Sequence, residues 1–139
     1  MKDGRKRVLF VCIGNSCRSQ MAEAFARAYG GDVVIPASAG LAPASIVAPD
    51  TYRAMLEKNI DIRHHFPKTI RQLGRARFDL AINMSGEEIS PDAGEDIVEW
   101  DIPDPVRFSY ERHCEVRDEI ERRVMNLVLE LRRTQAILV

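Results

Sequence analysis

The segment Val8-Leu9-Phe10-Val11-Cys12-Ile13-Gly14-Asn15-Ser16-Cys17-Arg18-Ser19 passes from an apolar run through glycine and asparagine into a helical pattern. The apolar run ends after six residues and lacks the small-residue cleavage pattern of a signal peptide, so it predicts a buried strand. From Ser19 to Tyr29, apolar side chains recur at spacings of three and four, and Gly30-Gly31 follows as a stop signal. The segment therefore predicts a strand, a tight loop and a helix, in that order.

The rest of the chain repeats this alternation of strand and helix patterns. Strand patterns occupy Arg7 to Cys12, Asp32 to Ala37, Phe78 to Asn83 and Glu95 to Trp100. Further helical patterns occupy Pro49 to Lys58, with Asn59 as a left-handed stop, and Ser109 to Arg133. The alternation indicates an α/β fold with a parallel sheet covered on both faces, and the length predicts a single domain, residues 1–139. Ligands of such sheets bind beyond the carboxyl ends of the strands, so function is expected in the loops that follow them.

The overall composition excludes several classes of function. Lys and Arg number 20 against 21 Asp and Glu, a net charge of -1, which gives no general attraction to nucleic acid or to an anionic membrane. No apolar run approaches the roughly 20 residues of a membrane span, so we expect a soluble, cytoplasmic protein. Three cysteines form no CxxC pair, and His64 and His65 are adjacent, which predicts free thiols in a reducing compartment and no metal site.

The loop after the first strand has the composition of an oxyanion cradle. Glycine and asparagine tolerate a positive φ, which lets consecutive backbone N–H groups point inward, and the start of the following helix adds unpaired donors. Cys12 lies at the floor of this cradle, where the helix N-terminus and neighbouring donors are expected to hold it as a thiolate. The predicted phosphate-binding residues are Ile13, Gly14, Asn15, Ser16, Cys17, Arg18 and Ser19.

Individual side chains of this loop have expected roles. The Arg18 guanidinium can bind two equatorial oxygens at once, which lysine cannot do, and Ser19 can donate its hydroxyl to the sulfur. A Cys-x5-Arg spacing also arises by chance, and the alternative for Cys12 is a buried, unreactive thiol. The strand before it, the glycine in the loop and the helix after it favour the cradle. Cys17 is either a small buried residue or a redox partner of Cys12, and Cys114 is expected to have no chemical role.

The stretch from Val8 to Tyr29 resembles the active-site segment of the low-molecular-weight protein tyrosine phosphatase family, which includes related arsenate reductases. Matches at Ser38-Ala39-Gly40, Ile60 to His64 and Asp104-Pro105 extend the resemblance over nearly the whole chain. It implies a four-stranded parallel sheet flanked by helices on both faces. It also implies a cysteine-dependent phosphomonoester hydrolase, foremost a protein tyrosine phosphatase, that acts on a phosphoprotein or small aryl phosphate through a phosphocysteine without a cofactor.

A general acid is expected in the loop after the fourth strand. Asp104 precedes a proline, which holds it in extended backbone, and the resemblance selects it as the catalytic acid beside Cys12 and Arg18, with Asp101 as a rival. The resemblance also places His64 near the position that contacts the active-site asparagine. We therefore predict a supporting, non-catalytic contact between His64 and Asn15.

Arsenate reduction at the same thiolate is the alternative, because arsenate copies the charge and shape of phosphate. Gln20 and the segment Trp100 to Pro105 resemble the reductase branch, whereas family phosphatases more usually carry proline at the first position and aromatic residues around the cleft. The loop after Asn83 lacks the resolving cysteine pair of thioredoxin-linked reductases, so an external thiol reductant or Cys17 is required. A non-hydrolytic phosphocarrier is a third hypothesis, against which Arg18 and Asp104 argue.

Overall fold

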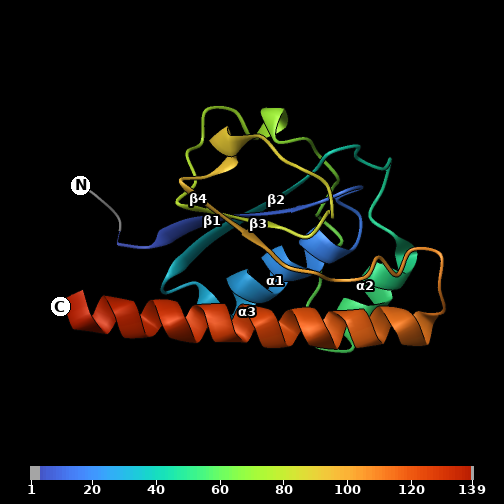
Figure 1. Ribbon diagram of the computed structural model, residues 1–139. Helices are drawn as coiled ribbons and strands as arrows, with labels where there is room; N and C mark the ends of the chain where they lie inside the picture. Colours follow the sequence, from blue (N-terminus) through green and yellow to red (C-terminus); the bar gives the residue numbers. More distant parts are fainter. Residues whose placement is uncertain (1–3, 139) are drawn as a thin grey trace.

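The computed structural model describes residues 4–138 and confirms the predicted order of strands and helices (Figure 1). Its elements are β1 (Lys6–Cys12), α1 (Arg18–Gly30), β2 (Val34–Gly40), α2 (Pro49–Leu56), the 3-10 helix η1 (Arg71–Leu73), β3 (Leu80–Asn83), the 3-10 helix η2 (Pro91–Ala93), β4 (Asp96–Glu99) and α3 (Tyr110–Leu138). Asn59 has a φ of 60° and ends the α2 turn as predicted. β2 starts two residues later than predicted and continues through Gly40, and α3 continues past the predicted end at Arg133 to Leu138.

The four strands form one parallel sheet in the order β2-β1-β3-β4. The chain leaves the inner strand β1 for β2 on one side and later returns to β3 on the other side. Cys12 at the end of β1 pairs in register with Gly40, and Val11 pairs with Asn83. The carboxyl end of β1 is therefore a topological switch point, where open α/β sheets bind their ligands.

Helices flank both faces of the sheet, as predicted, but the two layers differ. All three α-helices pack on one face, where Phe10, Phe25, Met55, Ile82 and Ile120 contribute to a continuous buried core. The opposite face is covered by the 3-10 helices and their connecting segments over a smaller cluster that includes Leu9 and Val11. Figure 1 shows the long α3 running beneath the sheet and α1 between them. None of the helices within residues 4–138 is long and apolar enough to cross a membrane.

Candidate active site

The loop between β1 and α1 is held by hydrogen bonds to its own carbonyl oxygens. Five consecutive carbonyl oxygens accept hydrogen bonds. Those of Cys12, Ile13 and Gly14 accept from Leu41 N (3.1 Å), Ala42 N (2.9 Å) and Ala44 N (2.9 Å). That of Asn15 accepts from Gln20 Nε2 (3.0 Å), and that of Ser16 accepts from Ala48 N (3.0 Å). In a planar trans peptide, the N–H of the next residue points opposite to the carbonyl. Because the carbonyls face outward to residues 41–48 and to Gln20, the amides from Ile13 to Cys17 face inward, as an anion cradle requires.

Asn15 provides the sharp turn of this loop. Its φ is 49°, in the left-handed region, and its side chain donates to Ser19 Oγ (2.7 Å) and accepts from Lys68 N (3.0 Å). Gly14, which also tolerates a positive φ, does not have one, since the positive-φ glycines among residues 4–138 are Gly74 and Gly86. One residue in the left-handed region is sufficient to turn the loop, because the hydrogen bonds of the carbonyl oxygens on both sides of Asn15 fix the rest of its backbone.

The sulfur of Cys12 lies at the buried floor of the cradle, 2.8 Å from Ser19 Oγ, and Cys12 is 2% exposed. Ser19 Oγ already accepts a hydrogen from the Asn15 amide, so its own hydrogen is free to be donated to the sulfur. The predicted pairing of Ser19 with Cys12 is present in the structure.

Arg18 closes the cradle from the first turn of α1. Its buried guanidinium donates from Nη1 to Met84 O (2.5 Å) and Ile102 O (3.1 Å), on the loops that follow β3 and β4. Its Nη2 lies 3.5 Å from Asp104 Oδ2. The planar fork is thus fixed by two backbone carbonyls, which leaves its remaining N–H groups for an anion.

Asp104, rather than Asp101, shares a cavity with the nucleophile. Cys12, Arg18 and Asp104 line the same cavity of about 190 Å³, which Ile13, Gly14, Ser16, Cys17, Ala44 and Val106 complete. The Asp104 side chain is 48% exposed, and its Oδ1 accepts from Val106 N (3.1 Å), which orients the carboxyl group. Asp101 lines a neighbouring cavity of about 270 Å³ on the other side of Arg18. Asp104 therefore lines the same cavity as Cys12 and Arg18, and its role as the acid stays a prediction.

The predicted contact between His64 and Asn15 is wrong. His65 makes the contact instead, and it does so through Gln20: His65 Nδ1 lies 2.8 Å from Gln20 Oε1, and Gln20 Nε2 lies 3.0 and 3.1 Å from the two oxygens of Asn15. Because Gln20 Oε1 can only accept, His65 Nδ1 carries the hydrogen. His64 is exposed and packs edge-on against the His65 ring. Two adjacent histidines in a loop carry no periodicity, so the sequence could not separate them.

Stability should depend on pH through His65. Burial lowers the pKa of His65 below its usual value of 6.5, so between the two values the unfolded chain binds a proton that the folded chain does not. The contribution of neutral His65 to the free energy of unfolding is complete above pH 6.5 and is lost as the pH falls toward the lowered pKa. His65→Gln keeps a hydrogen-bond donor for Gln20 but does not titrate. We therefore expect the free energy of unfolding of this variant to fall less between about pH 7.5 and 5.5 than that of the unmodified chain. The measurement is urea unfolding of this variant and of the control His64→Gln at each pH. If the free energy of unfolding of His65→Gln changed with pH as much as that of the unmodified chain, the pH dependence would not come from His65.

Gly40 is the close-packing point between β2 and the nucleophile loop. A Cβ at this position would lie 2.7 Å from Ile13 O and 2.9 Å from Asn15 N, both backbone atoms that cannot move independently of the cradle. We expect Gly40→Ala to destabilise the fold by about 1–3 kcal/mol and to weaken phosphate binding. Gly31→Ala is the matched control, because a Cβ there makes only ordinary contact, at 3.5 Å. Chemical unfolding and phosphate titration check both effects, and an equal result for the two variants would contradict the packing role.

Cys17 is the buried residue of the loop that directly precedes α1, and it lines the cavity over Cys12. Burial is the main cause that raises the pKa of Cys17 to about 12, and a hydrogen bond with Thr51 only partly offsets it. Cys114 lies apart on α3, where its sulfur is 3.5 Å from Glu57 Oε2 and burial again raises its pKa. Within residues 4–138, no group of three His, Cys, Asp or Glu side chains is placed to bind a metal ion.

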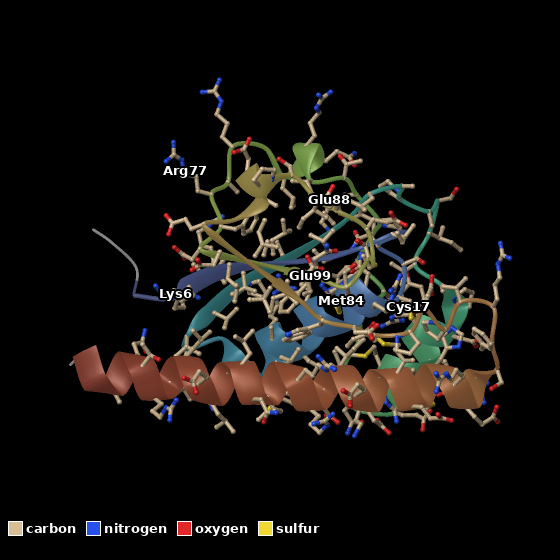
Figure 2. The ribbon with its side chains drawn as sticks, viewed as in Figure 1. Lys6, Cys17, Arg77, Met84, Glu88 and Glu99 are labelled. Atoms are coloured by element: carbon tan, nitrogen blue, oxygen red, sulfur yellow. The ribbon has the colours of Figure 1, made fainter. Side chains whose placement is uncertain are left out.

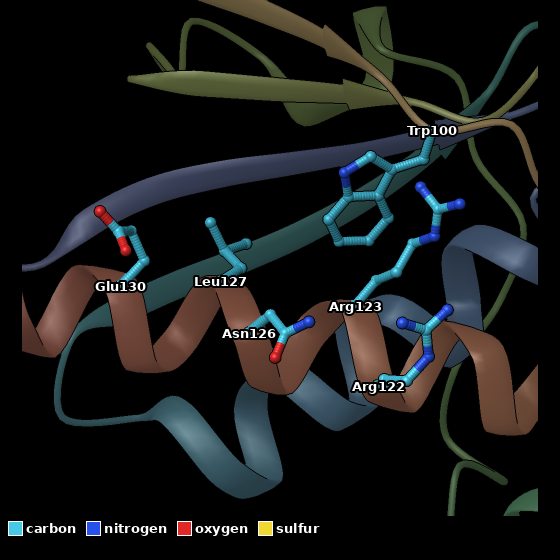
Figure 3. A pocket seen from close by; sticks show the side chains of 6 residues that line it. All are labelled: Trp100, Arg122, Arg123, Asn126, Leu127 and Glu130. Carbon is cyan, nitrogen blue, oxygen red and sulfur yellow. The ribbon is translucent and has the colours of Figure 1, made fainter.

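A larger cavity lies away from Cys12. It measures about 520 Å³ and follows α3 beside Trp100 (Figure 3), with Arg122, Arg123, Asn126, Leu127 and Glu130 as its other lining residues. Arg123 stacks 5.9 Å from the Trp100 ring and also pairs with Glu119. Arg122, Arg123 and Glu130 are paired with charges outside the lining, and the lining includes no nucleophile, so the smaller cavity over Cys12 is the candidate active site.

Comparisons with known proteins agree with this geometry. Residues 7–136 match the family model described as low molecular weight phosphotyrosine protein phosphatase. An arsenate reductase of Bacillus cereus (strain AH187) is 36% identical over 126 residues, 88% of this chain and 93% of the relative. A glutaredoxin arsenate reductase of Synechocystis sp. is 35% identical over 133 residues, 91% of this chain and 98% of the relative.

Two solved structures extend the comparison to the fold. An arsenate reductase in the phosphate-binding state superposes with a TM-score of 0.83 at 34% identity, covering 91% of this chain and 98% of its own. An arginine phosphatase from Geobacillus stearothermophilus superposes with a TM-score of 0.80 at 26% identity, covering 94% of this chain and 96% of its own. Both reductases and phosphatases therefore share this architecture.

Proposed function

The chain belongs to the low molecular weight phosphotyrosine protein phosphatase family, and from this membership we propose that it is an arsenate reductase that uses Cys12 as nucleophile and an external thiol as reductant. This is the second of the two activities predicted from the sequence. The observation that carries it is the cavity over Cys12, whose lining residues are small or aliphatic apart from the charged pair Arg18 and Asp104. Such a cavity suits a bare tetrahedral oxyanion better than an aryl ester, which aromatic walls would bind. Its relatives named arsenate reductase support the same choice.

The proposed reaction begins with arsenate in the cradle. The Cys12 sulfur attacks arsenic, a sulfur–arsenic bond forms, and one arsenate oxygen leaves as water after taking up two protons. The inward amides and Arg18 bind the remaining oxygens, and Asp104 delivers a proton to the departing oxygen. The oxidation state of arsenic is still +5 at this point. The product of the step is a thiol–arsenate adduct on Cys12.

Electrons then come from thiols outside the chain. A first thiol attacks the Cys12 sulfur, a disulfide forms, and arsenic leaves as arsenite with the electron pair of the broken bond. A second thiol releases Cys12 and forms the external disulfide, so two electrons pass from two thiols to one arsenate. Cys17 is poorly suited to replace the first thiol, because its burial raises its pKa to about 12 and disfavours the thiolate at pH 7.

The direct test is arsenate-dependent oxidation of dithiothreitol, with arsenite measured as product. We expect one arsenite for each disulfide formed, and inhibition by phosphate, which competes for the cradle. Sulfate at the same ionic strength is the control for a salt effect. Absence of arsenite with dithiothreitol and with every other thiol supplied would reject the reductase proposal.

Phosphomonoester hydrolysis is the second candidate, and the position of Asp104 favours it. A carboxyl group that lines the nucleophile cavity and is half exposed can protonate an alkoxide or phenoxide leaving group. We expect Asp104→Asn to lower hydrolysis of an aryl phosphate by about 10²- to 10⁴-fold. The loss should shrink for substrates whose leaving group is a weak base.

Asp101→Asn is the matched control, since Asp101 lines the neighbouring cavity. Steady-state kinetics with two aryl phosphates of different leaving-group basicity give the comparison. Equal loss in the two variants, or a loss independent of the leaving group, would contradict the acid role of Asp104.

A further inference from the structure

A cavity separate from the one over Cys12 lies along α3, and we name it the α3 cavity. It measures about 520 Å³, compared with about 190 Å³ for the cavity over Cys12, and small-molecule sites are roughly 300–1,000 Å³. Trp100 forms one side, and the other lining residues come from a single stripe of α3 (Figure 3): Arg122, Arg123, Asn126, Leu127 and Glu130. This stripe is about 12 Å long, because a helix rises about 1.5 Å per residue. The α3 cavity therefore has the size of a site for an organic molecule rather than for a bare oxyanion.

One end of the α3 cavity carries two guanidinium groups that share a single carboxylate. Glu119 Oε1 accepts from Arg123 Nε (2.9 Å), and Glu119 Oε2 accepts from Arg122 Nε (3.2 Å) and Nη2 (2.5 Å). Within residues 4–138, no acceptor is bonded to Arg122 Nη1 or to either Nη atom of Arg123. Two cations against one anion leave a positive charge at this end, together with N–H donors that are free for an incoming anion.

The other end of the α3 cavity carries its one lining acid, Glu130, which is paired from outside. Both carboxylate oxygens of Glu130 accept from Arg133 Nη2 (2.5 and 2.6 Å), and Arg133 does not line the cavity. Between the two ends lie two further donors, the Asn126 amide and Trp100 Nε1, and neither makes a hydrogen bond with another of residues 4–138. The charges and donors of the α3 cavity thus favour an anion at the arginine end.

The middle of the α3 cavity is apolar. Trp100 and Leu127 are partly buried and pack against the main core, and the ring centroids of Trp100 and Phe10 are 6.1 Å apart. The guanidinium carbon of Arg123 lies 5.9 Å from the centroid of the Trp100 ring, so a cation lies beside an aromatic surface. Aromatic and aliphatic walls bind planar rings, and an arginine fork binds a carboxylate through two parallel hydrogen bonds. The cavity over Cys12 has no aromatic lining residue, so the two cavities differ in the ligand chemistry that they suit.

The α3 cavity and the nucleophile cavity have no lining residue in common. Trp100 instead lines, together with Arg18, the 270 Å³ cavity that lies between them. Figure 2 shows two other lining residues of that cavity, Met84 and Glu99, beside each other. A ligand of the α3 cavity is therefore separated from the sulfur of Cys12, and it should bind together with an oxyanion in the cradle rather than compete with it.

We infer that the α3 cavity is a binding site for a planar aromatic carboxylate. The ring packs against Trp100 and Leu127, and the carboxylate accepts from the free Nη atoms of Arg123 at the arginine end. A bare phosphate or arsenate would use the arginine end but not the apolar middle, and a neutral aromatic molecule would leave the guanidinium groups without an acceptor. This inference goes beyond the proposed reaction, which requires no second ligand.

The fluorescence of Trp100 tests the inference directly, because Trp100 is the single tryptophan of the chain. The probe is para-nitrobenzoate, whose nitro-substituted ring quenches indole fluorescence, and para-nitrobenzyl alcohol is its neutral counterpart. We expect saturable quenching by the carboxylate, with an affinity about ten-fold or more above that of the alcohol and decreasing as salt is added. Cyclohexanecarboxylate has the same charge but no aromatic ring, so displacement of the probe should require about ten-fold more of it.

Variants of two arginines on α3 locate the carboxylate. We expect Arg123→Gln to weaken the binding of para-nitrobenzoate about ten-fold and to leave the alcohol within about two-fold, because the variant removes the charged fork. Arg112→Gln is the matched control, since Arg112 lies on the same helix, outside the cavity, in an exposed pair with Glu115, and its affinity should stay within about two-fold of the unmodified chain. Circular dichroism and thermal unfolding check that both variants are folded.

Competition with inorganic phosphate separates the α3 cavity from the cradle. Phosphate at a concentration that saturates the cradle, as judged by calorimetry, should displace no more probe than chloride does at the same ionic strength. Full displacement by phosphate would place the probe in the cradle and would overturn the inference. Quenching that rises linearly and equally with the carboxylate and the alcohol would mean collision with a partly exposed ring, and equal affinities of the two arginine variants would remove the carboxylate from Arg123; either result also overturns it.

Discussion

Cys12→Ser is expected to lower arsenate reduction by roughly 10⁴-fold or more. A serine hydroxyl at the floor of the cradle does not ionise at neutral pH, and an oxygen cannot form the disulfide through which the electrons pass. The replacement is nearly isosteric and keeps the Ser19 hydroxyl as a hydrogen-bond partner at 2.8 Å, so the fold and anion binding should survive. Arsenite formation with dithiothreitol in excess is the measurement.

Cys114→Ser is the control for this variant, because it removes a partly buried thiol from α3 without touching the cradle. Phosphate binding, measured by calorimetry, should be retained in both variants. Reductase activity of Cys12→Ser within ten-fold of the unmodified chain would place the reacting sulfur elsewhere and would contradict the site assignment.

Arg18→Lys should give the second largest loss, about 10²- to 10³-fold in kcat/KM for arsenate. The guanidinium donates to Met84 O and Ile102 O while further N–H groups remain for the anion. A lysine ammonium has only three donors, so it cannot satisfy both buried carbonyls and also bind two oxygens of the substrate. The loss should appear mainly in kcat if the extra contacts tighten as the sulfur–arsenic bond forms.

Arg112→Lys is a matched control, because Arg112 forms only an exposed pair with Glu115. Phosphate should also bind more weakly to Arg18→Lys, and thermal unfolding separates this effect from a loss of fold. A kcat/KM for Arg18→Lys within about three-fold of the control would contradict the role of the guanidinium fork.

The fold could be predicted from the sequence where patterns are local. The apolar run before Cys12 and the three- and four-residue spacing after Ser19 were sufficient for β1 and α1, and α3 followed from its long periodic segment. The end of β2 was missed because Ser38, Ala39 and Gly40 carry no apolar alternation, although they pair with β1 in register. The 3-10 helices were not predicted, since three residues are too few to show a period.

The site was predictable in its chemistry but not in its supporting contacts. Cys12, Arg18 and Asp104 line one cavity as the motif and the resemblance indicated, although their catalytic roles stay predictions. The outward pairing of the loop carbonyls with segment 41–48 depends on residues distant in sequence, and no local pattern announces it. The exchange of His64 for His65 and the central place of Gln20 have the same cause, because side-chain networks follow tertiary packing rather than periodicity.

A single turnover quenched with acid tests the central claim most directly. The chain is mixed with arsenate and a limiting amount of cysteamine, and the cysteine peptides are identified by mass spectrometry. The account predicts a cysteamine disulfide on Cys12 that forms only when arsenate is present and appears together with arsenite. Labelling of Cys17 or Cys114 instead, or arsenite formed without any modification of Cys12, would contradict it.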